Sequence, residues 1–261
     1  MPDDVVPRLA ALRTDPARTA IVTDFDGTLS PIVDDPASAA PLPGVVDVLH
    51  ELAARYGRVA VVSGRPVTFL RERLELADRP PTSLFVSGLY GIEWLEDGEE
   101  RVHETALAYQ PAVAEAADRA EAAAPAGVHV ERKGYSVTIH VRNAPEELDW
   151  ARSWAEATAA TTGLALHAGR MSFELRPPLD VDKGSVVDAL VAGRAAACFL
   201  GDDLGDLPAF DALDRLQAAS DAATVRIGVR SPEAPAELLE RADVIVDGPA
   251  GSLGVLRSLL D

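Results

Sequence analysis

The most constraining feature of this sequence is a regular alternation of short apolar runs with helical segments between residues 19 and 89. The runs Ala20–Val22, Val59–Val62 and Leu84–Val86 are typical of buried strands, because they lack the polar alternation of half-exposed ones. The intervening helices are predicted over Val45–Arg55, whose apolar residues have helical spacing, and over Val67–Leu76. This alternation predicts a parallel sheet with helices on both faces.

The alternation stops near residue 90 and resumes after residues 177 and 178, both prolines. A hairpin is predicted around Glu96–Glu99, and the following segments give a β-α-β-β-α-β order, typical of a small separate sheet. The predicted elements are strands at 92–95, 100–103, 128–131, 135–142, 164–167 and 172–175 and helices at 112–123 and 146–160, and then helices at 185–191, 207–213 and 252–260 with strands at 196–200, 225–229 and 244–246. We therefore expect an α/β fold, with a doubly wound, Rossmann-like core of residues 1–104 and 177–261 and an inserted, smaller α+β cap domain of residues 105–176.

Composition narrows the partners and the compartment. A net charge of −18 makes nucleic acid and anionic membranes poor partners. No apolar run is long enough to span a bilayer, and the acidic amino terminus lacks a signal pattern. The single cysteine, Cys198, lies in an apolar run and cannot form an internal disulfide. We expect a cytoplasmic protein, and a monomer.

Two carboxylates and a glycine follow the first apolar strand, in the order Asp24, Phe25, Asp26, Gly27. Ligands of open parallel sheets bind at the carboxyl ends of the strands, and alternate residues of an extended segment share a face. Two carboxylates brought together in this way favour a hard cation such as Mg²⁺ together with a phosphate. One aspartate could attack phosphorus while the other protonates the leaving oxygen, and Thr28 offers a hydroxyl to phosphate oxygens. A polar turn is the alternative, because Asp-Gly is a common turn pair.

Polar residues also follow the later strands. Ser63 and Gly64 offer a hydroxyl and backbone amides that suit a phosphate, although taken alone this pattern favours a plain helix N-cap for the serine. Lys183 lies at a predicted helix start, where a cation is slightly unfavourable. An ammonium that bridges the nucleophile and the phosphate would explain its position, and a solvated loop lysine is the alternative. Lys183 and Lys133 are the only lysines beside 22 arginines, which favours a specific role for each.

A second group of carboxylates, Asp202, Asp203 and Asp206, follows the apolar run Ala196–Leu200 and repeats the pattern of the first strand. Acidic residues that merely complement a helix dipole are the alternative. Two such groups at two strand ends, with Lys183 between them in the sequence, favour a common site.

Four sequence features therefore follow one another along the chain: the aspartates after the first strand, the serine with its glycine, the lysine, and the second group of carboxylates. With these features in this order the chain resembles the haloacid dehalogenase superfamily of phosphotransferases. The resemblance implies that Asp24 is the nucleophile and Asp26 the general acid/base, and that Ser63 and Lys183 bind the phosphoryl group. It also implies a Mg²⁺ ion, whose ligands would be Asp24, the backbone carbonyl of Asp26 and Asp202, with Asp203 or Asp206 in support.

The other lysine lies in the predicted insertion, in the sequence Glu131-Arg132-Lys133. Glu131 and Lys133 are two residues apart, on one face of a predicted strand. Acid–cation pairs suit sugar hydroxyls, which both donate and accept hydrogen bonds. An ordinary surface ion pair is the alternative.

With this stretch the resemblance narrows to the family of trehalose-6-phosphate phosphatases. The resemblance to this family covers nearly the whole chain. Ser87–Gly91 is similar to that family's glycine-rich junction, with Tyr90 where histidine is commoner, and Glu174–Pro177 is similar to its cap exit. The resemblance implies that the residues holding the glucose units are Glu131, Lys133, Arg142 and Glu174. The chain departs from the family at Gly205-Asp206-Leu207, where a Thr-Asp-Glu sequence is frequent.

The resemblance implies Mg²⁺-dependent hydrolysis of trehalose 6-phosphate in trehalose biosynthesis, through an aspartyl-phosphate. A phosphatase for sucrose 6-phosphate or mannosyl-3-phosphoglycerate is the alternative within this class. A non-catalytic partner of a trehalose-phosphate synthase is the alternative outside it, but it would be expected to lose the nucleophile or the acid, and both are present. Zinc-dependent hydrolysis is a weaker hypothesis, because the five histidines do not have the spacing of paired zinc ligands.

Overall fold

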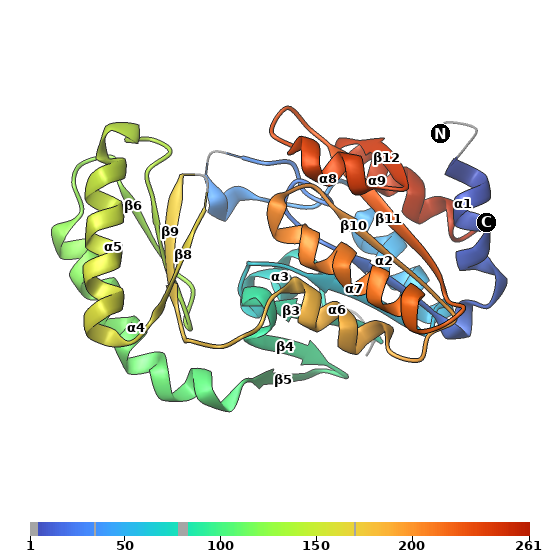
Figure 1. The fold of residues 1–261 in the computed structure, drawn as a ribbon, viewed down its shortest axis with the longest axis horizontal. Helices are drawn as coiled ribbons and strands as arrows, with labels where there is room; N and C mark the ends of the chain where they lie inside the picture. The colour runs from blue at the N-terminus through green and yellow to red at the C-terminus, as the bar shows by residue number, and fades with distance from the viewer. Residues whose placement is uncertain (1–4, 34, 78–82, 170) are drawn as a thin grey trace. The chain divides into compact units, whose positions relative to one another are not determined.

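The computed structural model describes residues 5–33, 35–77, 83–169 and 171–261 (Figure 1). The chain forms two compact units, one of Met1–Arg101 with Val181–Asp261 and one of Val102–Asp180. Each unit is built on a sheet of its own. The insertion expected at residues 105–176 falls within the second unit.

The first unit contains an eight-stranded sheet in the order β12-β11-β10-β1-β2-β3-β4-β5. The strands are β1 (Thr19–Thr23), β2 (Arg58–Val62), β3 (Leu84–Gly88), β4 (Glu93–Glu96), β5 (Glu99–Val102), β10 (Ala196–Gly201), β11 (Ala223–Arg230) and β12 (Val244–Asp247). Neighbouring strands from β12 to β3 are parallel, and β4 is antiparallel to β3. The central strands β1 and β10 therefore end at the same edge of the sheet, in register from Thr19 with Ala196 to Thr23 with Leu200.

Helices cover both faces of this sheet, because alternate strand residues point to opposite sides. Ile21, Val59 and Cys198 face one layer of helices, whereas Val22 and Phe199 face the other. The first layer contains α1 (Val5–Thr14), α2 (Val45–Arg55), α3 (Val67–Arg73) and α9 (Gly248–Ser258), and the second contains α6 (Lys183–Val191), α7 (Leu207–Ala219) and α8 (Ala236–Arg241). The predicted doubly wound α/β core is confirmed, although the sequence analysis missed α1 and α8.

The second unit contains a four-stranded antiparallel sheet in the order β6-β7-β9-β8. Its elements are α4 (Glu104–Ala123), β6 (His129–Arg132), β7 (Val137–His140), α5 (Leu148–Thr162), β8 (Ala165–Ala168) and β9 (Ser172–Arg176). The apolar strand residues Val137, Ile139 and Phe173 pack with α4 and α5 on one face of the sheet. Strand alternation therefore places Thr138 and Glu174 on the opposite face, which is polar.

The elements predicted after residue 90 occur in the predicted order, but the hairpin strands do not belong to the small sheet. The hairpin strands β4 and β5 extend the large sheet, so the second unit begins with a helix instead of a strand. That helix, α4, starts earlier than the predicted residue 112. It contains Pro111 and begins at Glu104, where His103 accepts a hydrogen bond from the amide of Thr105 at 3.3 Å and caps the first turn.

Short 3₁₀ helices connect several of these elements. They are η1 (Pro16–Arg18), η2 (Pro36–Ser38), η3 (Leu89–Gly91), η4 (Pro145–Glu147) and η5 (Leu204–Asp206). Within the described part of the chain, no helix is both long enough and apolar enough to cross a bilayer.

Candidate active site

The first predicted carboxylate lies directly beyond β1, in the middle of the large sheet. The amide of Asp24 donates to the carbonyl of Leu200 at 2.9 Å, so the β1–β10 pairing continues to this residue, whose side chain is buried. Gly27 then turns the chain with φ +74°, and its amide donates to the carbonyl of Ser30 at 2.7 Å. A Cβ on Gly27 would lie 1.9 Å from Oδ2 of Asp202, so only glycine leaves room for that carboxylate.

Lys183 is buried and joins the two acidic segments. It occupies the first turn of α6, which Asp182 caps by accepting from the amide of Ser185 at 2.8 Å. Its Nζ lies 2.7 Å from Oδ1 of Asp24 and 2.6 Å from Oδ1 of Asp206. The solvated loop lysine considered from the sequence is therefore wrong. Two carboxylates in contact outweigh the unfavourable helix terminus.

The sequence left open whether Asp203 or Asp206 supports the metal, and the two side chains differ in the structure. Asp206 is fully buried, and its Oδ2 accepts from the amides of Asp202 at 2.8 Å and Asp203 at 3.1 Å. Asp203 is exposed, and its side chain accepts from the amide of Gly205 at 2.8 Å within η5. Carboxylate oxygens of Asp24, Asp202 and Asp206 all lie within 4.8 Å of one another. Asp206, and not Asp203, thus belongs to this buried cluster.

Electrostatics make the cluster receptive to a cation. Burial raises the pKa of Asp24 well above its usual range, and the charges of Asp206 and Asp202 add to this while Lys183 opposes it. Burial and the charges of Asp206 and Asp203 likewise raise the pKa of Asp202 to about 8. Burial disfavours the charge of Lys183, yet Asp206 and Asp24 hold its pKa above the usual value. Three buried carboxylates exceed the charge of one ammonium, and hard oxygen donors of this kind fit a divalent cation such as Mg²⁺.

Asp26 lies beside this cluster but is held by an arginine that the sequence analysis did not single out. Arg65 donates from Nε to Oδ2 of Asp26 at 2.7 Å and from Nη2 to Oδ1 at 2.8 Å. The same guanidinium lies over the ring of Phe69, 4.8 Å from its centroid, and donates to the carbonyl of Pro36. The signal for Arg65 was its position directly after Ser63 and Gly64, at a strand end on the same edge of the sheet.

Ser63 is buried at the end of β2 and does not cap a helix. Its hydroxyl accepts from the amide of Arg65 at 3.2 Å, whereas α3 begins only at Val67 with Pro66 before it. The amide of Val67 instead donates to the carboxyl of Glu93. This carboxyl is buried, and burial raises its pKa. The N-cap interpretation of the serine is therefore wrong.

Gly64 lies under an aromatic ring. A Cβ on Gly64 would lie 2.5 Å from the hydroxyl of Tyr90, so any other residue there would require the tyrosine ring to move. Tyr90 adopts φ +60°, and its amide donates to the carbonyl of Ser63 at 3.0 Å. The preceding residue, Leu89, also has a positive φ and donates to the carbonyl of Arg65. Two consecutive left-handed residues thus brace the loop that the sequence predicted to bind phosphate.

Thr28 is buried, and its hydroxyl donates to Oδ1 of Asp202 at 3.4 Å. Its side chain therefore joins the first strand end to the acidic segment after β10. The structure thus brings together Asp24, Asp26, Thr28, Ser63, Gly64, Lys183, Asp202 and Asp206 at one edge of the sheet of the first unit.

The residues predicted to hold sugar lie in the second unit. Lys133 lies one residue beyond β6, so the strand that was predicted to carry both side chains ends before it. Its Nζ nevertheless lies 3.7 Å from Oε2 of Glu131 and 3.5 Å from Oε1 of Glu174. These three side chains therefore form a group on the polar face of the sheet. Arg142 lies two residues beyond β7 and its side chain is exposed.

Comparison with known proteins decides the family. The model of the trehalose-phosphatase family matches residues 22–240, which include every predicted site residue. The chain belongs to the trehalose-phosphatase family. A trehalose-phosphate phosphatase of Mycobacterium marinum is 38% identical over 207 residues, which cover 75% of this chain and 52% of that protein. The chain thus spans about half the length of the curated relatives that it matches.

Solved structures of the trehalose-phosphatase family share the fold. A trehalose-6-phosphate phosphatase related protein aligns with a TM-score of 0.76 and 23% identity, over 92% of this chain and 96% of the other. The C-terminal domain of the Candida albicans trehalose-6-phosphate phosphatase aligns with a TM-score of 0.75 and 23% identity, over 97% and 96%. Both alignments extend over nearly the whole chain, so the likeness includes both units.

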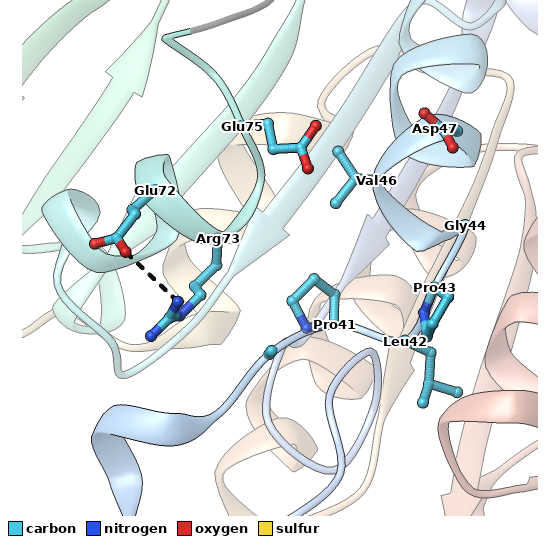
Figure 2. A pocket seen from close by; sticks show the side chains of 10 residues that line it. Pro41, Leu42, Pro43, Gly44, Val46, Asp47, Glu72, Arg73 and Glu75 are labelled. Carbon is cyan, nitrogen blue, oxygen red and sulfur yellow. Dashed lines mark hydrogen bonds and ion pairs between the residues drawn. The ribbon is translucent and has the colours of Figure 1, made fainter.

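A cavity of about 350 Å³ in this trehalose-phosphatase family member lies elsewhere in the first unit. Figure 2 shows Pro41, Gly44 and Val46 on one side of it and Glu72 and Arg73 on the other, with an ion pair between the last two. It shares no residue with the cluster around Lys183. The predicted site is therefore defined by the convergence of strand ends and not by this cavity.

Proposed function

We propose that the chain hydrolyses trehalose 6-phosphate to trehalose and phosphate, with Asp24 as the nucleophile and an aspartyl-phosphate as the intermediate. The observation that carries this proposal is the contact of Lys183 with Asp24 and Asp206 at the end of β1. It is supported by membership of the trehalose-phosphatase family and by relatives named trehalose-phosphate phosphatase.

In the first step, a carboxylate oxygen of Asp24 attacks phosphorus and the bond from phosphorus to the sugar oxygen breaks. The carboxyl of Asp26 gives its proton to that leaving oxygen. Both oxygens of Asp26 accept from Arg65 in the structure, so at least one of these bonds must open for the transfer. Lys183, 2.7 Å from the nucleophile, stabilises charge on the transferring group together with the hydroxyl of Ser63 and the amide of Gly64.

In the second step, a water molecule attacks the phosphorus of the aspartyl-phosphate. Asp26 takes a proton from this water, and the bond between phosphorus and Asp24 breaks to release phosphate. The proton that Asp26 gave in the first step is thereby returned, and both carboxyl groups are regenerated.

The carboxylate cluster would hold Mg²⁺ through Asp24, the backbone carbonyl of Asp26 and Asp202, with Asp206 in support. When bound, the ion neutralises negative charge on the phosphoryl group. The support for this assignment is the set of three buried carboxylates whose oxygens lie within 4.8 Å of one another. Asp203, exposed and bonded to Gly205, is left outside the metal site.

The second unit would supply sugar recognition through Glu131, Lys133, Arg142 and Glu174. The support is the grouping of acidic and cationic side chains on one polar face, because each sugar hydroxyl needs both a donor and an acceptor. We place this activity in the cytoplasm, with the protein acting as a monomer on a small-molecule sugar phosphate. A trehalose-phosphate synthase is the candidate protein partner, because it would supply the substrate.

The test is phosphate release from trehalose 6-phosphate, sucrose 6-phosphate, mannosyl-3-phosphoglycerate and p-nitrophenyl phosphate, with and without Mg²⁺. We expect preference for trehalose 6-phosphate and loss of turnover by about four orders of magnitude in Asp24→Asn. Asp203→Asn is the matched control and should keep most of the activity. Release from another sugar phosphate but not from trehalose 6-phosphate would overturn the substrate, and undetectable turnover on every substrate would favour a regulatory protein.

A further inference from the structure

The polar face of the second unit carries two side chains that the proposed function does not use. His140, at the end of β7, lies with Nε2 at 2.8 Å from Oε2 of Glu131. Ser136, just before β7, donates from its hydroxyl to Oε1 of Glu174 at 2.6 Å. A carboxylate only accepts hydrogen bonds, so the imidazole Nε2 is the donor to Glu131. Each end of the group around Lys133 is therefore fixed by a neighbour.

Burial differs between these two contacts, since the side chains of His140 and Glu131 are 26% and 19% exposed whereas the contact of Ser136 with Glu174 is buried. Ser136 is 1% exposed, and the side chains of Glu174 and Lys133 are each 9% exposed. Hydrogen bonds to charged groups are stronger than neutral ones, and more so away from water. The contacts of Lys133 with the two carboxylates are longer, at 3.5 and 3.7 Å. The short bonds from His140 and Ser136, and not the lysine, therefore set the directions of the two carboxylates.

Strand register explains why these residues meet. Glu131 pairs with Thr138 and Thr138 pairs with Glu174. The three residues therefore form one row across β6, β7 and β9, with a carboxylate at each end. His140 lies two residues further along β7, on the same face. The ring of His129 lies beside that of His140, with centroids 5.8 Å apart.

We propose that His140 and Ser136 are positioning residues for sugar recognition, which orient Glu131 and Glu174 toward the hydroxyls of a disaccharide phosphate. This inference rests on the proposed function, because it assumes that these carboxylates contact the sugar. Neither residue is assigned a contact with the phosphoryl group. Their loss should therefore weaken binding of a disaccharide phosphate and leave a small aryl phosphate unaffected.

The experiment compares steady-state kinetics on trehalose 6-phosphate and on p-nitrophenyl phosphate. We expect His140→Phe and Ser136→Ala each to raise KM for trehalose 6-phosphate about tenfold, with kcat changed less than about twofold. Values for p-nitrophenyl phosphate should stay within about twofold. His140→Gln, which keeps a donor near Nε2, should recover most of the affinity. Ser153→Ala, at an exposed serine of α5, is the matched control and should behave as the wild type.

Several outcomes would overturn the inference. An unchanged KM for trehalose 6-phosphate in folded variants would do so, and so would an equal loss on both substrates, which indicates a structural role. If His140→Phe does not fold by circular dichroism, His140→Gln and Ser136→Ala carry the comparison. If the wild type prefers another disaccharide phosphate, the proposed substrate fails and the same variants are compared on that compound. Activity on the aryl phosphate alone would overturn both proposals.

Discussion

The two lysines of the chain each lie between two carboxylates, but at different distances. Lys183 contacts Asp24 and Asp206 at 2.7 and 2.6 Å in the first unit. Lys133 lies 3.5 Å from Glu174 and 3.7 Å from Glu131 in the second unit. The side chain of Lys183 is 4% exposed and that of Lys133 is 9% exposed, so burial alone does not separate them.

The difference in distance suits two kinds of chemistry. Charge-assisted contacts below 2.8 Å fix the atoms around Lys183, as a transferring phosphoryl group requires, because preorganised charges stabilise it without reorganisation. Distances of 3.5 Å and more are long for hydrogen bonds, so the group around Lys133 can exchange these contacts for sugar hydroxyls. The backbone explains the contrast: Lys183 begins the regular helix α6, whereas Lys133 lies in the turn after β6, next to Gly134 with φ +78°.

Replacing each lysine by methionine gives the largest expected difference. Lys183→Met should lower kcat by about three orders of magnitude on both trehalose 6-phosphate and p-nitrophenyl phosphate, because it removes a charge beside the nucleophile. It should also destabilise the fold by about 3 kcal/mol, since two buried carboxylates lose their partner. Lys133→Met should raise KM for trehalose 6-phosphate about tenfold and leave the aryl phosphate unchanged. Steady-state kinetics and urea unfolding measure both effects.

The control is Lys183→Arg, which keeps the charge but places a larger guanidinium in a buried position. We expect little recovery, because the fork cannot reproduce two contacts from one nitrogen. If both lysine variants changed the same kinetic constant on both substrates, the contrast between the two groups would be wrong.

The second prediction concerns the cation that we expect in the group around Lys183, here called the first group, and not in the group around Lys133, the second group. Asp202→Asn should weaken Mg²⁺ binding by one to two orders of magnitude, about what loss of a ligand charge costs. The measurement is the rise in melting temperature with added Mg²⁺, which follows binding without reference to activity. Asp203→Asn is the matched control and should keep the wild-type rise. An equal rise in all three proteins, or a loss in Asp203→Asn alone, would contradict the assignment of the metal ligands.

Much of the first group could be predicted from the sequence, because parallel strands that end at one sheet edge bring their following residues together. Asp24 and Asp202 were identified in this way, whereas Lys183 was singled out because lysine is rare in the chain and because it lies at a predicted helix start. The choice between Asp206 and Asp203 could not be made, since it depends on which side chain the 3₁₀ turn η5 directs inward. Arg65 was missed because its partner, Asp26, is far away in the sequence.

The second group was predictable in composition but not in geometry. The pattern of Glu131 and Lys133 indicated a polar face, yet their strand ends at Arg132. The roles of His140 and Ser136 depend on the pairing of β6 with β7 and of β7 with β9. Strand register is a long-range property that local spacing does not determine.

The smallest expected effect is the pH dependence that His167 contributes in the second unit. His167 lies on β8, paired with Glu174, and burial and the charge of Arg176 lower its pKa below the ordinary value of 6.5, against the opposing charge of Glu174. The unfolded chain therefore binds the proton more tightly than the folded one does. Stability is present above about pH 6.5 and decreases as the pH falls through and below that value.

Thermal unfolding of the wild type and His167→Gln at pH 7.5 and pH 5.5 checks this sign. The wild type should lose slightly more stability on acidification than the variant. The margin is small because much of His167 stays exposed to solvent, which limits the effect of burial on its pKa. The two proteins differ only at residue 167, so contributions from the rest of the chain cancel in the difference. The group around Lys183 contains only carboxylates and an ammonium and contributes equally to both. An equal loss, or a larger one in His167→Gln, would mean that protonation of His167 does not distinguish the second group from the first.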